Sequence, residues 1–243
     1  MMALSASIQI SDQDIYQQSS VANAELIGQV AGTSDGRTFR YARSAGALTR
    51  GQLTEPGTVV ANYANRTLSV ASAAGSNRVT VTLGTTATAD QFIGHYLVVN
   101  DGTGEGQGVY YITGNTAATA GTSNATTITF RGALTIALTN ASDVTIQPSQ
   151  ESNVIQHTAA ATTPAAGAPV VAVTSGYWFW NQVGGMASIL SAGAITKNAL
   201  AIASAAVAGA ATIDLAASVT QLVGFAPELT VDTEYSPLVL TIG

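Results

Sequence analysis

Residues 78–83 read Arg-Val-Thr-Val-Thr-Leu, and this hexapeptide decides the fold class. Apolar and polar side chains alternate strictly along it, which places Val79, Val81 and Leu83 on one face and the two threonines on the other. A two-residue period is typical of a β-strand that buries one face and turns the other to solvent. The hexapeptide therefore predicts a sheet.

Segments with a similar strand-like pattern recur between residues 58 and 150. Further strands are predicted at 67–71, 96–100, 108–112, 126–130 and 143–146. Their connections are rich in Gly, Asn, Ser and Thr, and short strands with such turns indicate a sandwich or a barrel. One helical turn is expected at residues 90–93.

The flanking segments also predict strands, with less regular spacing. Strands are expected at 25–31, 38–42, 51–55, 169–173, 177 onward, 219–226 and 236–242. The Asp-Gly pair after Ser34 predicts a hairpin turn. The Ala-rich stretch 199–211 fits a helix and short strands equally well. Residues 1–20 have little periodicity and predict an extended arm, with one short strand at 6–10.

The charge content is low and excludes some functions. Only 9% of the residues are charged and the net charge is −6, whereas about 25% of residues are charged in an ordinary soluble domain. Nucleic-acid binding requires clustered basic residues, so no nucleic-acid partner is expected. No apolar stretch reaches the roughly 20 residues of a membrane helix, so no membrane partner is expected. A neutral Thr- and Ser-rich surface suits packing against many copies of the chain or of a partner, and also fits a secreted β protein.

The residues that usually carry chemistry are sparse. The chain has no cysteine and two isolated histidines, His95 and His157. The glycine cluster at residues 101–108 is followed by a predicted strand, whereas a dinucleotide-binding loop opens a helix. It is interpreted as a hairpin turn, and whether it binds an ion stays open. We therefore expect no enzyme activity, no catalytic residue, no cofactor and no metal site.

Two groups of residues are candidates for binding a partner. The first holds half of the basic residues with two aromatics between them: Arg37, Phe39, Arg40, Tyr41, Arg43 and Arg50. Arginine pairs well with carboxylates, so this group could dock an acidic surface; the alternative is pairing within the chain, with Asp35, Glu55 or Glu25. The second group is the run of aromatics that could lie at an interface or in the core: Tyr177, Trp178, Phe179 and Trp180.

Several segments together resemble bacteriophage capsid decoration (cement) proteins. They are Gly36-Arg-Thr-Phe-Arg-Tyr-Ala, Gly46-Ala-Leu-Thr-Arg-Gly-Gln-Leu, Gly94-His-Tyr-Leu-Val-Val-Asn-Asp-Gly-Thr-Gly-Glu-Gly-Gln, Gly176-Tyr-Trp-Phe-Trp-Asn-Gln-Val-Gly-Gly-Met-Ala, Val223-Gly-Phe-Ala and Val231-Asp-Thr-Glu-Tyr-Ser-Pro-Leu-Val-Leu.

The resemblance implies an all-β architecture in three parts. Residues 24–57 and 151–243 would form a discontinuous β-barrel-like domain that faces the capsid. Residues 58–150 would form an inserted, outward-projecting β-sandwich-like domain. Residues 1–23 would be an extended arm that reaches neighbouring subunits.

The resemblance also implies a function. The chain would be a virion protein on the outer capsid surface, made in the host cytoplasm. It would bridge capsomers as a homotrimer, with the major capsid protein and itself as partners. Two alternatives stay open: a tail or fibre-associated virion protein, and a carbohydrate-binding adhesive sandwich with Trp178 and Trp180 as its sugar platform.

Overall fold

The computed structural model describes residues 7–23, 25–57, 60–119, 124–159, 163–213 and 221–242. Its secondary structure is almost entirely β, which confirms the predicted fold class. The chain forms two compact units, one of residues 1–57 with 150–243 and one of residues 58–149. We call them the discontinuous unit and the inserted unit. Their borders agree within one residue with the expected domain borders at 57/58 and 150/151.

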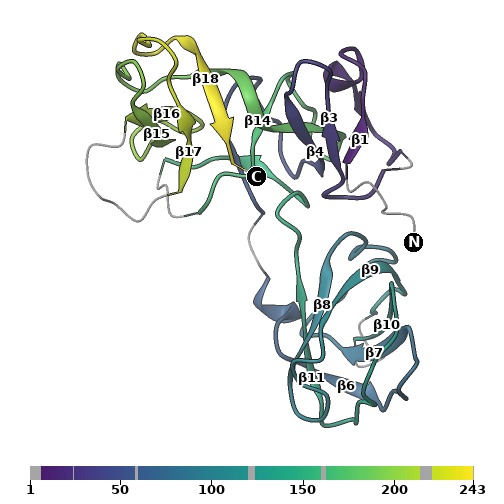
Figure 1. The fold of residues 1–243 in the computed structure, drawn as a ribbon. Coiled ribbons are helices and arrows are strands. Elements are labelled where there is room, and N and C mark those ends of the chain that lie inside the picture. The colour runs from purple at the N-terminus through teal and green to yellow at the C-terminus, as the bar shows by residue number, and fades with distance from the viewer. Residues whose placement is uncertain are drawn as a thin grey trace. The chain divides into compact units, whose positions relative to one another are not determined.

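The discontinuous unit combines both ends of the chain (Figure 1). Its elements are β1 (Ser7–Gln9), η1 (Asp14–Tyr16), β2 (Gln18–Ser19), β3 (Val30–Gly32), β4 (Thr38–Arg43), β5 (Thr54–Glu55), β12 (Ile155–Gln156), β13 (Ala168–Pro169), β14 (Trp178–Leu190), β15 (Leu200–Ala203), β16 (Ala211–Ile213), β17 (Leu222–Phe225) and β18 (Tyr235–Thr241). The main sheet has the order β1-β3-β4-β14-β18-β17-β15-β16, with β2 and β13 also paired to β14. Strands β5 and β12 form a separate pair.

Strand β14 organises this unit because its two halves have different partners. Its first half pairs with β4 and its second half with β18. The change falls at Gly184 and Gly185, where the pairing with β4 shifts register. Gly185 has a φ of +80°, and a Cβ there would lie 3.0 Å from the Cα of Arg37. Only glycine fits such a position without strain.

The inserted unit is a closed barrel. Its elements are η2 (Ala61–Tyr63), β6 (Arg66–Val70), β7 (Arg78–Thr82), β8 (Tyr96–Asp101), β9 (Val109–Asn115), β10 (Ala125–Phe130) and β11 (Asp143–Gln147), and its strand order is β10-β7-β6-β11-β8-β9. Val79, Val81 and Leu83 all lie in its core, as the alternation predicts.

This arrangement corrects the expected sandwich-like form of the insertion and the barrel-like form of the discontinuous domain. The inserted unit is the one that closes, through the β9–β10 and β6–β11 pairings, whereas the sheet of the discontinuous unit is not a closed ring. Alternation gives the buried face of each strand, but it carries no information on whether the outermost strands of a sheet meet.

The N-terminal segment is packed onto its own unit, which corrects the expected extended arm for residues 7–23. Strand β1 pairs in parallel with β3, and β2 pairs with β14. Ile15 is fully buried in a cluster with Phe39, Tyr41 and Trp180. Isolated isoleucines in a polar segment give no periodic signal, so only the tertiary contacts reveal this packing. Residue 6 of the predicted strand lies outside the described residues.

The Ala-rich stretch, for which a helix and short strands were both open, forms strand β15 and the start of β16. Some other predictions need correction. The strand expected at 169–173 is only the two-residue β13, residues 90–93 form a turn, and residues 25–29 lie outside β3. Residues 219 and 220 of the next predicted strand are not among the described residues.

Candidate functional site

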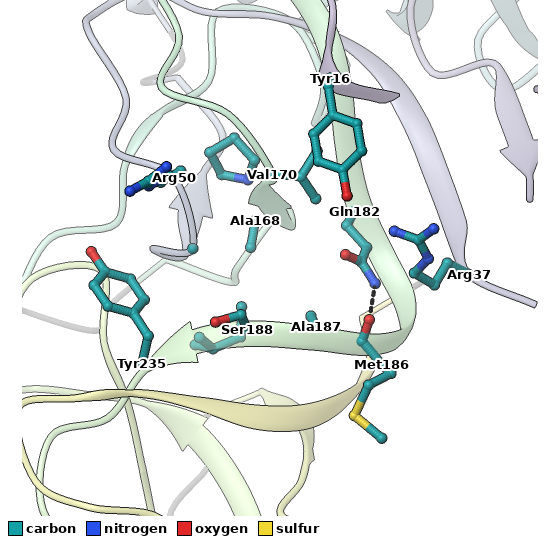
Figure 2. Close-up of a pocket in the computed structure, with 13 residues that line it drawn as sticks. Tyr16, Arg37, Arg50, Ala168, Val170, Gln182, Met186, Ala187, Ser188 and Tyr235 are labelled. Carbon is teal, nitrogen blue, oxygen red and sulfur yellow. Dashed lines mark hydrogen bonds between the residues drawn. The ribbon is translucent and has the colours of Figure 1, made fainter. Parts of the chain in front are cut away.

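A pocket of about 500 Å³ lies on the discontinuous unit (Figure 2), in the range typical of ligand sites. Strands β13 and β14 supply its lining from Ala168, Pro169 and Ala187. Arg37 and Tyr16 line one side, and Arg50 and Tyr235 line the other (Figure 2). The pocket therefore combines guanidinium groups with apolar side chains.

Arg37 is already neutralised by its neighbours. Its Nε donates to Asp35 Oδ2 at 2.7 Å and its Nη2 donates to Asp12 Oδ1 at 3.0 Å. Partial burial lowers the pKa of this guanidinium, but hydrogen bonds to Asp35 and Tyr16 outweigh burial and leave its pKa above the ordinary value. These contacts hold the Arg37 side chain in place as one wall of the pocket. Its charge is already paired and is of little use for binding a partner.

Arg50 differs, because its exposed side chain makes no ion pair with any described residue. Its backbone is anchored by the next residue: Gly51 N–H donates to Pro169 O at 2.8 Å, and Leu190 N–H donates to Gly51 O at 2.9 Å. A Cβ on Gly51 would lie 2.7 Å from Ser188 O, so glycine is needed for this close approach. Arg50 is thus a cation on a fixed backbone with no ion-pair partner among the described residues.

The other arginines do not join this site. Arg40 lies 3.4 Å from Glu151, and the guanidinium of Arg43 lies 5.7 Å from the ring centroid of Trp178. Phe39 and Tyr41 are buried. The six residues of the first candidate group therefore do not form one docking patch. The predicted intramolecular pairing occurs for Arg37 with Asp35, while Arg40 takes a partner that the sequence did not suggest.

The aromatic run alternates across β14 as predicted. Tyr177 and Phe179 pack in one cluster, and Trp178 and Trp180 pack in another. Trp180 is only 5% exposed, and Trp178, which is half-buried, stacks on Tyr41 with ring centroids 5.6 Å apart. A sugar platform requires exposed ring faces, so this pair of tryptophans does not provide one.

Both histidines are buried. The ring nitrogens of His157 lie 2.8 Å from Thr158 O and 3.0 Å from Thr163 O, and its Nε2 lies 3.7 Å from a Glu55 oxygen. These contacts tie the end of β12 to a loop and to β5, which is a structural role.

The glycine cluster after β8 is a hairpin loop leading into β9, as predicted. Gly106 N–H closes it by donating to Val99 O at 3.0 Å. Within the part of the chain that the structure describes, no group of three or more His, Asp or Glu residues could hold a metal ion.

Several residues that line the pocket had no signal in the sequence. Tyr16, Gly51, Gln182 and Tyr235 come from four separate segments, and only the folding of both chain ends into one unit brings them together. Gln182 is 2% exposed, and its Nε2 donates to Met186 O at 2.9 Å, which holds the turn of β14 beside the pocket.

Among the described residues, no helix has the length and hydropathy of a membrane span. Searches of protein-family models, of curated proteins and of solved structures found no match to the chain.

Proposed function

We propose that the chain is a structural protein of a bacteriophage particle, which binds the outer surface of the assembled capsid and bridges capsomers. Three features support this proposal: the sequence resemblance to decoration proteins, a surface with few charges, and a two-unit β architecture divided where the resemblance implies. The partners are the major capsid protein and further copies of the chain, three at each site by the same resemblance.

The observation that carries the proposal is Arg50, which lies beside the pocket and makes no ion pair with any described residue. A chain with a net charge of −6 and 9% charged residues offers few cations to a partner, and this one stands on an anchored backbone next to apolar side chains. The pocket would take a segment of the capsid protein that carries a carboxylate. A charge-assisted hydrogen bond between guanidinium and carboxylate gives such a contact its orientation.

If the chain binds the assembled shell and not the separate capsid protein, its binding would stabilise the shell. A protein that binds one state and not its separated parts shifts the equilibrium toward the bound state by mass action. Contacts that cross a capsomer boundary also add buried area that must be exposed when the shell ruptures. The packaged genome presses outward, and such contacts resist it.

The test is sedimentation of the purified chain with assembled shells and, separately, with unassembled capsid protein. We expect co-sedimentation with shells alone. Arg50→Glu should weaken shell binding by about tenfold or more, because it places like charges in contact. Arg78→Glu is the matched control, since Arg78 is an exposed arginine of the inserted unit, which is expected to project outward.

The alternatives predict other results. Binding of the wild-type chain to tails or fibres, with no binding to shells, would replace the proposal with a tail role. Binding to glycans in place of shells would favour an adhesive protein, although the buried Trp180 argues against a tryptophan platform.

A further inference from the structure

One face of the sheet in the discontinuous unit carries side chains that are exposed or half-buried, and its edge borders the pocket at Met186, Ser188 and Tyr235. Cross-strand partners point to the same side of a sheet, so the registers identify the residues of this face. Leu200 pairs with Phe225, Phe225 with Val239, and Val239 with Met186. One row of apolar side chains therefore crosses β15, β17, β18 and β14. Leu200 and Met186 are each 52% exposed.

Neighbouring pairs widen this row into a continuous surface. We call it the outer face, and it consists of Met186, Ser188, Leu190, Leu200, Ile202, Thr212, Leu222, Phe225, Tyr235, Pro237, Val239 and Thr241. The intervening residues, such as Ala187, Leu238 and Leu240, point the other way into the core. Figure 2 shows the Met186 side chain directed away from the other labelled residues of the pocket.

An irregularity in β17 adds to the outer face. In a regular strand Leu222 and Phe225 would point to opposite sides, because they are three positions apart. The register between β15 and β17 shifts at Ala201/Ile202, so that Ile202 pairs with Leu222 while Ala201 pairs with Gly224. The extra residue is Val223, which is fully buried. The bulge therefore turns both Leu222 and Phe225 outward, onto the same face.

The outer face has no charged residue, and its size is appropriate for a contact. Five strands at spacings of about 4.8 Å, with about 3.3 Å per residue, give a face of roughly 400 Å². Patches of about 300–600 Å² are the largest that monomers usually expose and often have a function. An uncharged apolar surface needs an uncharged apolar partner, because a charge buried against it without a pair is strongly unfavourable.

We propose that the occupant of the outer face is the same face of a second copy of this chain, in a two-fold contact. The chain itself provides such a surface, because the outer face is largely apolar and uncharged. Two such faces can pack as the layers of a sandwich pack, with side chains interdigitating between sheets about 10 Å apart. The contact buries about 800 Å² in total, less than the roughly 1,200–2,000 Å² of stable interfaces, so it should dissociate on dilution.

This inference does not depend on capsid binding. A two-fold contact joins two chains or, if the chains also form trimers, two trimers. The particle in concentrated solution should therefore contain two or six copies. On dilution it should fall to one or three.

The first test measures mass against concentration by analytical ultracentrifugation. Phe225→Lys should raise the dissociation constant of the two-fold contact by about 100-fold or more, as expected for an apolar residue at the centre of an interface. Leu200→Lys should have the same effect. Because Leu200 is more exposed than Phe225, this variant keeps the test valid even if Phe225→Lys impairs folding. Val109→Lys is the matched control, because Val109 is 64% exposed on the inserted unit.

The second test uses the absence of cysteine from the chain. Val239→Cys places one thiol near the centre of the outer face, and a short bismaleimide should link two chains through it. Val70→Cys, on the inserted unit, should give no linked dimer. Two results would overturn the proposal: a wild-type mass of one or three copies at every concentration, or an unchanged mass in both lysine variants. Neither result would bear on sedimentation with shells, which tests the proposed function separately.

Discussion

The two units of this chain differ in how they pair their strands and bury their apolar side chains. In the inserted unit each barrel strand has a neighbour on both sides, and one cluster of buried side chains fills the interior. The discontinuous unit has a sheet that ends at β1 and β16, and its buried side chains are divided among three clusters. Closure lets the backbone N–H and C=O groups of every strand pair with a neighbouring strand. An open sheet leaves unpaired groups at its edges, where other contacts can form.

Both surfaces proposed above for binding lie on the unit with the open sheet. The pocket with Arg50 and the uncharged outer face both belong to the discontinuous unit. The inserted unit exposes single apolar side chains such as Val70 and Val109, which are normal on a soluble surface. Under the two proposals above, the discontinuous unit would make the contacts with partners, and the barrel would not.

The largest effect is expected from a variant that unfolds the barrel alone, which tests whether the two units are stable independently. Ile128 is fully buried in the barrel core, and Ile128→Asp should destabilise it by about 3–5 kcal/mol or more, because the carboxylate would be buried without a partner. A loss of that size is comparable to the whole stability of a small domain. Calorimetry should show that the transition of the barrel is lost.

Tryptophan fluorescence separates the two units in this experiment, because Trp178 and Trp180 both lie in the discontinuous unit. Their unfolding transition should be unchanged in Ile128→Asp. The control, Val70→Asp, introduces the same charge at an exposed position and should leave both transitions in place. If the tryptophan signal disappears together with the barrel transition, the two units fold as one.

A smaller effect is expected at the turn of β14, within the discontinuous unit. Gly185→Ala should cost about 1–2 kcal/mol for the left-handed backbone and about 1–3 kcal/mol more for crowding against Arg37. Gly193→Ala is the matched control, because Gly193 has a similar φ of +83° and a Cβ added there would have no other atom within 4 Å. Denaturant unfolding followed by tryptophan fluorescence measures both. Equal losses would show that the close approach at Gly185 carries no energetic weight.

The smallest effect concerns Asp35 beside the pocket. The Thr33 hydroxyl holds the pKa of Asp35 below its ordinary value of 3.8. Desolvation opposes this shift, and the backbone N–H and guanidinium of Arg37 support it. The interactions of this carboxylate therefore stabilise the fold above about pH 4 and are lost as the pH falls through the lowered pKa.

Thr33→Val should raise the pKa of Asp35 toward 3.8, as measured by NMR titration of the side-chain carboxyl. Thr82→Val, in the inserted unit, should leave it unchanged. If the pKa of Asp35 is unchanged in Thr33→Val, the lowered pKa would be due to Arg37 alone.

The candidate site was only partly predictable. The cluster of arginines drew attention to Arg37 and Arg50, and both line the pocket. Sequence proximity nevertheless grouped them with Arg40, which pairs with Glu151, a residue more than 100 positions later in the sequence. Tyr16, Gln182 and Tyr235 had no sequence signal, because no local pattern reports which distant segments will meet.

The sequence by itself determined the all-β class and the inward side of most strands, because alternation with period two depends only on local geometry. Val79 and Val81 are buried as that period requires, and the aromatic run of β14 divides between two sides. Tertiary structure alone decided that the insertion closes into a barrel, that Ile15 joins a core, and that a bulge at Val223 turns two apolar residues outward. Each of these outcomes depends on pairing between strands, and the free energy of such pairing comes from partners that are remote in the sequence.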